Sequence, residues 1–145
     1  MIAKRIIIFA VIVLCVAGTV LFYVRNIRKN DFRTSIENLH TEEIVSVVIE
    51  KEGKAAIVID HNQIDMLGKF LTILKGMQKW RPEHPTVTEY IYITIHTLKS
   101  KYSLECMLVK EKPGVVFFDY VEGQIIVGNF QNRGLYRFLK DLFVI

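Results

Sequence analysis

Apolar residues form one uninterrupted run near the N-terminus of the sequence. Residues 6–24 contain no charged side chain, and a helix over this run would rise roughly 28 Å, close to the hydrocarbon thickness of a bilayer. A secretory signal peptide has a shorter apolar core of roughly 7 to 15 residues, whereas apolar residues continue here beyond Gly18. A lipoprotein leader is also disfavoured, because Leu14 precedes Cys15 where a small residue is expected. The pattern therefore predicts an uncleaved transmembrane anchor over residues 6–24.

Basic residues flank this run on both sides. On the N-terminal side they lie in a short tail, residues 1–5, and on the C-terminal side they begin directly after Val24. The flanking basic residues are Lys4, Arg5, Arg25, Arg28, Lys29 and Arg33. We expect them to contact anionic head groups of the membrane lipid bilayer, where each charge contributes about 1 kcal/mol.

The charges alone do not decide the orientation of the anchor, because the positive-inside rule nearly cancels between the two flanks. A short basic N-terminal tail is typical of an anchor whose N-terminus stays in the cytoplasm. We therefore expect a single-pass protein of a bacterial inner membrane or plasma membrane, with the C-terminal domain outside the cytoplasm.

The pattern of apolar positions changes after the anchor. Residues 25–43 are polar with sparse apolar positions, which predicts a juxtamembrane stalk or a continuing helix. From residue 44 onward, runs of β-branched residues alternate with turn residues, so residues 44–145 are expected to form an α+β domain. A chain of this length is enough for one hydrophobic core.

The first part of this domain has the pattern of a hairpin followed by a helix. Two β-branched runs within residues 44–60 are joined at Glu52 and Gly53, which predicts two antiparallel strands. Asp60 then stands before Gln63 at capping-box spacing, so a helix is expected to follow. Apolar residues at helical spacing give this helix one apolar stripe, at Ile64, Leu67, Leu71 and Leu74.

The second part predicts four strands and a last helix. Turn residues at 99–101, 112–114 and 122–123 separate four alternating segments between residues 89 and 130, and such short connections make neighbouring strands antiparallel. The last helix is amphipathic, with Leu135, Phe138, Leu139 and Leu142 at helical spacing. The predicted fold is an N-terminal transmembrane helix followed by a small antiparallel sheet, in the order ββαββββα, covered by helices on one face.

The net charge of +4 arises from the basic residues that flank the apolar run. Residues 1–33 carry six Lys and Arg against one Asp, a net of +5, whereas residues 34–145 carry thirteen against fourteen acidic residues, a net of −1. The domain has no basic stripe, so nucleic-acid binding is not expected.

Residue types with catalytic or ligand-binding chemistry are scarce. His40, His61, His84 and His96 fall in four different elements without metal-ligand spacing, so no metal site and no cofactor are expected. Cys106 lies in the middle of a strand and is expected to be an inert packing residue. No nucleophile motif or glycine-rich phosphate loop occurs, and we do not expect an enzyme.

Two features favour a binding surface instead. In the strand EYIYITIHTL, the isoleucines take one face and the tyrosines the other, so the tyrosines point outward if the isoleucines face the helices. The preceding loop holds the only tryptophan of the chain, among residue types that are common in binding hot spots. The candidate partner-binding residues are Trp80, Arg81, Glu83, His84, Tyr90, Tyr92 and His96.

The sequence therefore favours a membrane-tethered, non-enzymatic protein-binding module. Such a module is either an accessory subunit of a membrane complex or an inhibitor, for instance an immunity-type protein with a toxin-like target. Two alternatives stay open: a sensor or carrier domain that binds a small ligand or lipid, and an enzyme with an unrecognised site.

Overall fold

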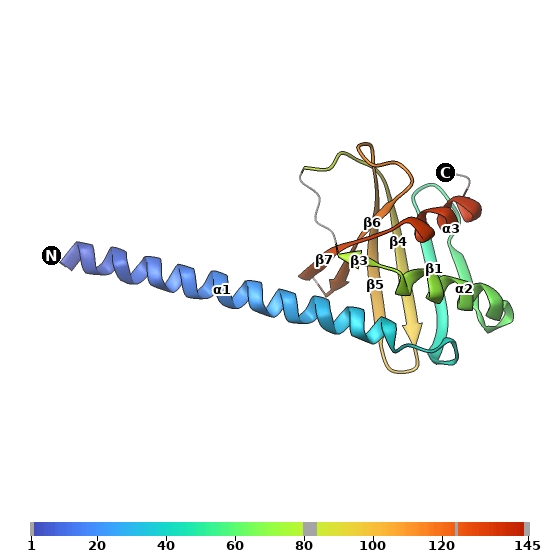
Figure 1. Ribbon diagram of the computed structural model, residues 1–145, viewed down its shortest axis with the longest axis horizontal. Coiled ribbons are helices and arrows are strands. Elements are labelled where there is room, and N and C mark those ends of the chain that lie inside the picture. The colour runs from blue at the N-terminus through green and yellow to red at the C-terminus, as the bar shows by residue number, and fades with distance from the viewer. Residues whose placement is uncertain (1, 80–83, 124, 144–145) are drawn as a thin grey trace.

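A computed structural model of the chain describes residues 2–79, 84–123 and 125–143. One long helix, α1, projects from a domain in which helices lie against a sheet (Figure 1). The elements are α1 (Ile2–Glu37), η1 (Thr41–Glu43), β1 (Ile44–Lys51), β2 (Ile57–Asp60), η2 (His61–Gln63), α2 (Ile64–Lys75), β3 (Gln78–Lys79), β4 (Val87–Thr97), β5 (Lys101–Val109), β6 (Val116–Glu122), β7 (Ile125–Asn132) and α3 (Arg133–Phe143).

The sheet is antiparallel throughout. Within the described residues it has seven strands in the order β2-β1-β4-β5-β6-β7-β3. This confirms the predicted α+β fold, with one addition. The two-residue strand β3 pairs with β7 at the sheet edge, and the predicted order ββαββββα does not include it. Two residues are too few to show the alternation that identifies a strand.

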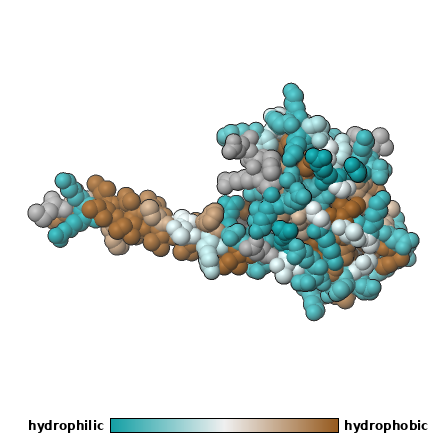
Figure 2. Space-filling view, viewed as in Figure 1, coloured by the Kyte–Doolittle hydropathy of each residue, from teal (hydrophilic) through white to brown (hydrophobic). Residues whose placement is uncertain are grey.

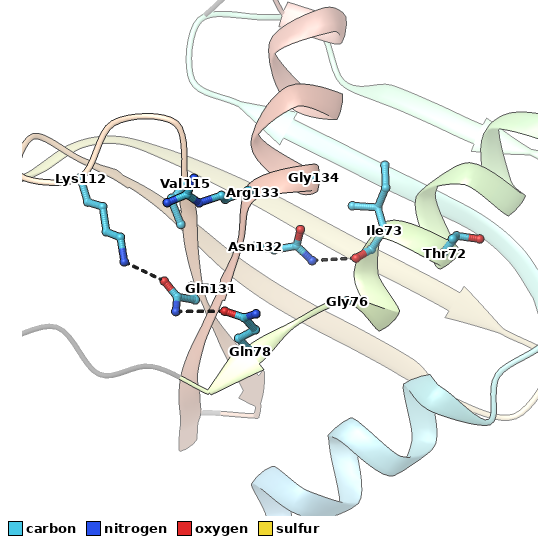
Figure 3. Close-up of a pocket in the computed structure, with 10 residues that line it drawn as sticks. All are labelled: Thr72, Ile73, Gly76, Gln78, Lys112, Val115, Gln131, Asn132, Arg133 and Gly134. Atoms are coloured by element: carbon cyan, nitrogen blue, oxygen red, sulfur yellow. Dashed lines mark hydrogen bonds between the residues drawn. The ribbon is translucent and has the colours of Figure 1, made fainter.

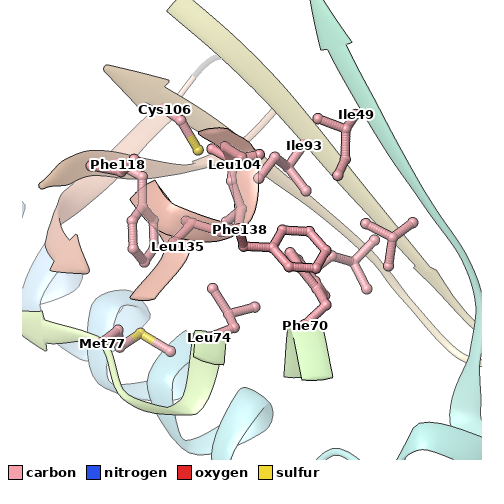
Figure 4. Close-up of a cluster of buried hydrophobic side chains, with 14 of the residues drawn as sticks. Ile49, Phe70, Leu74, Met77, Ile93, Leu104, Cys106, Phe118, Leu135 and Phe138 are labelled. Atoms are coloured by element: carbon pink, nitrogen blue, oxygen red, sulfur yellow. The ribbon is translucent and has the colours of Figure 1, made fainter. Parts of the chain in front are cut away.

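The hydrophobic core lies between one face of the sheet and the helices α2 and α3 (Figure 4). Ile49, Ile93 and Leu104 point from the sheet and are at most 2% exposed. The two helices meet over them, where the rings of Phe70 and Phe138 lie 5.7 Å apart between centroids. Burying a side chain of this size contributes roughly 1.5 to 3 kcal/mol, so this layer supplies most of the stability of the domain.

The start of α2 differs in detail from the sequence prediction. Asp60 does act as a cap, but its carboxylate accepts a hydrogen bond from the Asn62 backbone N–H at 2.9 Å, one turn before α2 itself. Ile64 is the first residue of α2 and is 46% exposed. The buried stripe of this helix therefore consists of Leu67, Phe70, Leu71 and Leu74.

The long helix α1 has two parts with different surroundings. Its N-terminal part is long and apolar enough to cross a membrane, and the most apolar window of the helix is not buried inside the protein. Figure 2 shows this apolar surface on the part of the helix that projects from the domain. The C-terminal part is in the core, where Phe32 is 2% and Ile36 is 0% exposed. One continuous helix therefore joins the apolar segment to the domain.

Several of the basic residues after the apolar segment contact the domain or α1 itself. Arg25 donates a hydrogen bond from Nη2 to the Ile126 carbonyl oxygen at 3.1 Å. Lys29 places its Nζ 5.2 Å from the centre of the Phe130 ring, and Arg33 forms an ion pair with Glu37 at 2.9 Å. The contacts of Arg25 and Lys29 hold the flank of α1 against β7, whereas the Arg33–Glu37 pair lies within α1. Contact of the basic residues with lipid head groups stays a prediction.

Candidate functional site

The central strand β4 separates an aliphatic face from an aromatic face. Ile91, Ile93 and Ile95 are at most 1% exposed and belong to the core beneath the helices. Tyr90 and Tyr92 are 44% and 47% exposed, on the opposite side of the sheet. The prediction that the isoleucines face the helices and the two tyrosines face outward is confirmed.

The two exposed tyrosines form one aromatic surface. Their ring centroids lie 6.5 Å apart, and their ring planes are only 11° from parallel. Residues two positions apart on a strand share a face at a spacing of about 6.6 Å, so the backbone geometry alone places the rings side by side. Because β4 lies inside the sheet, between β1 and β5, the rings rest on a rigid support.

Three acidic residues, Glu50, Glu105 and Asp119, form a row across the sheet that passes through Tyr92, and we call them the acidic row. The strand register places Tyr92 directly opposite Glu50 of β1 on one side and Glu105 of β5 on the other. Glu105 in turn lies opposite Asp119 of β6. Residues opposite one another on antiparallel strands share a face, with Cβ atoms about 4.5 to 5.5 Å apart. We call the surface formed by Tyr90, Tyr92, Glu50, Glu105 and Asp119 the tyrosine face.

Asp119 has the most unusual electrostatic environment on the tyrosine face. Its side chain is half-buried, and its Oδ1 atom is buried without a hydrogen-bond partner among the described residues. Burial, and then the neighbouring Glu105 carboxylate, raise the pKa of the Asp119 carboxyl above its usual range, and Lys29 and Arg25 offset part of this effect. A positive group brought to this point would therefore be stabilised by both carboxylates.

The same side of the sheet is closed at one end by a second, smaller buried cluster. Tyr90 lies opposite Met107 of β5, which lies opposite Phe117 of β6. Phe117 is only 1% exposed and clusters with Val109 and Val115. Alternation predicts an outward side chain for Phe117, and its burial shows that the region around the β5–β6 turn folds over this end. The open part of the aromatic surface is thus centred on the two tyrosines.

The remaining predicted site residues are only partly described. His96 is half-buried, and its strand partners are Ser46 and Lys101. His96 lies four residues beyond Tyr92 on the same face, about 13 Å along the strand. His84 is exposed and has a φ angle of 51°. Trp80, Arg81 and Glu83 lie outside the described residues, so their contribution to the tyrosine face stays a prediction.

The acidic row was not among the sequence-predicted site residues. The signal for part of it was present, because alternation in YSLECMLV separates Glu105 from the buried Leu104 and Cys106. The row itself depends on which strands are neighbours. Placing Glu50 beside Tyr92 requires the pairing of β1 with β4, which no short turn in the sequence indicates.

The described residues include no group of three or more His, Cys, Asp and Glu side chains that could hold a metal ion. Cys106 is 1% exposed, and burial followed by the charges of Asp119 and Glu105 raises the pKa of its thiol. A thiol in this environment stays protonated and packs as an apolar side chain, as the sequence predicts.

Comparison of the chain with protein-family models, with curated proteins and with solved structures found no match.

Proposed function

We propose that this protein is a membrane-tethered, non-enzymatic module that binds another protein through the tyrosine face. The observation that carries the proposal is the pair of exposed, nearly parallel tyrosine rings at the centre of a rigid sheet. Tyrosine is enriched at protein interfaces because it offers a large apolar surface and a polar hydroxyl at little conformational cost. Side chains held in place before binding lose less entropy when a partner arrives.

The charge of the tyrosine face indicates the chemistry of the partner. Glu50 and Glu105 flank Tyr92, and Asp119 adds a carboxylate whose burial disfavours its charge. A lysine or arginine of the partner would relieve the repulsion between Glu105 and Asp119. We therefore infer a partner that presents apolar surface to the tyrosines and a basic group to the acidic row.

The tether supports a partner in or near the membrane. Phe32 in the core is eight residues beyond Val24, which corresponds to about 12 Å of helix. A domain held this close to the bilayer meets membrane-bound proteins at a raised effective concentration. The partner is then a subunit of a membrane complex to which this protein is an accessory, or a target that it inhibits in the manner of an immunity protein.

The proposed location follows from the anchor. With the short basic tail in the cytoplasm, α1 crosses the membrane once and the domain lies outside the cytoplasm. In a bacterium, this compartment is the periplasm or the cell exterior.

Affinity capture from gently solubilised native membranes tests the proposal. Three baits are compared: the wild-type chain, the double variant Tyr90→Ala/Tyr92→Ala, and a control Lys69→Ala, on the exposed face of α2. We expect the wild type and the control to recover the same partner and the double variant to lose it. Recovery of the same partner by all three baits would rule out the tyrosine face as the binding surface.

A further inference from the structure

We propose that the folded domain itself contacts the lipid bilayer, at the end of the sheet where β6 turns into β7, with Ile126 as the residue that enters the lipid. The proposal rests on the membrane anchor of the proposed function, and it does not depend on the tyrosine face. The partner of this second surface is a bilayer rather than a protein.

Ile126 lies next to the point where the apolar segment of α1 ends. Val24 is the last residue of the apolar run, and Arg25 follows it directly. Arg25 donates from Nη2 to the Ile126 carbonyl oxygen at 3.1 Å. An arginine at the end of a membrane span extends its guanidinium toward the interface between hydrocarbon and water. The hydrogen bond therefore places Ile126 at the level of this interface.

The contacts between α1 and β7 show which end of the strand faces the membrane. Arg25 bonds to Ile126 near the start of β7. One turn further along α1, Lys29 places its Nζ 5.2 Å from the centre of the Phe130 ring, and the ring of Phe32 lies 5.5 Å from the same ring between centroids. Both segments thus lead away from the apolar run together. In Figure 1, β7 accordingly lies on the side of the domain from which the apolar part of α1 projects.

The side chain of Ile126 is apolar and 46% exposed in the domain. A single exposed isoleucine is ordinary on a protein surface, and what distinguishes Ile126 is its place beside the end of the membrane span. Arg25 next to it is exposed as well. Interfacial segments bind bilayers through this combination, because the apolar side chain leaves water while the basic one attracts anionic lipid. The expected partner is therefore a bilayer that contains anionic lipid.

The strand that carries Ile126 is also fixed at its other end. Asn132, the last residue of β7, donates from Nδ2 to the Ile73 carbonyl oxygen of α2 at 2.7 Å (Figure 3). The Oδ1 atom of Asn132 accepts a hydrogen bond from the Leu135 N–H of α3 at 2.9 Å. With Arg25 at one end and Asn132 at the other, β7 has a set position between α1 and the other two helices. A bilayer around the apolar segment therefore meets Ile126 in one orientation of the domain.

Spin labels at three single positions test the contact in the full chain, reconstituted in vesicles of phosphatidylcholine and phosphatidylglycerol. The first position is the native Cys15, an exposed thiol in the middle of the apolar run. The others are Ile126→Cys and Val58→Cys, each combined with Cys15→Ala. Val58 is the matched control, because it is 53% exposed and lies on β2 at the far edge of the sheet. Cys106 is buried and is not expected to react with the label.

The bond from Arg25 is retained in Ile126→Cys, because it uses the backbone carbonyl. Oxygen concentrates in lipid and a nickel chelate stays in water, so relaxation of the label by each reports its surroundings. We expect oxygen to relax the labels at positions 15 and 126 more strongly than the chelate does, and the chelate to dominate at position 58.

The contrary outcomes separate this contact from the anchor. A label in water at position 126, with position 15 in lipid, would overturn the contact and leave the anchor intact. Lipid at all three positions would show that the domain has no defined contact, which would also overturn the proposal. A label in water at position 15 would contradict both the anchor and the contact.

Discussion

Phe32 of α1 stacks on Tyr120 of β6, with ring centroids 4.3 Å apart and ring planes 11° from parallel. The ring centroid of Phe32 also lies 5.9 Å from that of Tyr102 and 5.5 Å from that of Phe130. A residue of the long helix thus lies at the centre of an aromatic cluster on the sheet. The apolar helix and the domain therefore form one mechanical unit, and a membrane that holds α1 also fixes the tilt of the tyrosine face.

The first prediction tests this aromatic junction. Phe32→Ala should lower the free energy of unfolding of the domain by about 3 to 5 kcal/mol, the usual cost of truncating a buried phenylalanine. Phe22→Ala is the matched control, because Phe22 belongs to the same helix and is 73% exposed. Thermal unfolding in detergent should show a clear loss of Tm for the first variant and none for the second. Equal Tm values would mean that α1 is not part of the folded domain.

The second prediction concerns Tyr92, which is expected to contribute to partner binding and little to the stability of the domain. Because Tyr92 is 47% exposed, Tyr92→Ala should change the stability of the domain by less than about 1 kcal/mol. Affinity for the partner should fall by more than about 1 kcal/mol, as at a binding hot spot. Urea unfolding and partner titration measure the two effects separately. A large loss of stability with unchanged affinity would show that Tyr92 serves the fold.

The third prediction is a pH dependence at Asp119. Its pKa is raised in the folded state, so the folded state binds this proton more tightly than the unfolded chain does. The free energy of unfolding therefore decreases as pH rises from the ordinary carboxyl pKa, about 3.9, through the raised value. Asp119→Asn should remove this decrease and stabilise the domain at pH 7 by about 0.2 to 1 kcal/mol.

Two comparison variants complete the pH experiment. Glu105→Gln removes the other charge of the pair and should make the pH profile less steep without abolishing it, because burial, the larger cause of the raised Asp119 pKa, remains. Glu52→Gln, in the exposed turn between β1 and β2, should leave the profile unchanged. Urea unfolding between pH 3 and pH 8 gives the comparison. A destabilised Asp119→Asn variant at pH 7 would contradict the assigned environment.

The fourth prediction concerns membrane topology. A reporter enzyme that is active only after export, fused after residue 145, should be active, because the short basic tail is expected to keep the N-terminus in the cytoplasm. A reporter that is active only in the cytoplasm should be silent at the same position. The reverse result would make Arg25, Arg28, Lys29 and Arg33 the cytoplasmic flank and place the tyrosine face inside the cell.

The sequence predicts the secondary structure well, because most elements follow one clear period. Alternation in β4 assigned Ile93 to the core and Tyr92 to the surface, and both assignments are confirmed. Local signals of this kind do not reveal contacts between distant segments. Phe32 and Ile36 stand in a mainly polar stretch, so the sequence does not show that they pack against a sheet that begins later in the chain.

In the candidate site, too, the sequence predicts features set by neighbouring residues and misses those that depend on contacts between distant segments. Tyr90 and Tyr92 are two positions apart, and their shared face follows from strand geometry. The acidic row joins four strands, so it emerges only once the sheet order is known.

Site-specific photo-crosslinking tests the central claim, recognition of a protein partner by the tyrosine face, most directly. A photoreactive amino acid is placed at position 92 in one variant and at position 69, on the exposed side of α2, in another. After illumination of native membranes, we expect one discrete protein adduct from position 92 and none from position 69. The absence of a protein adduct at position 92, or the same adduct from both positions, would contradict the proposed binding face.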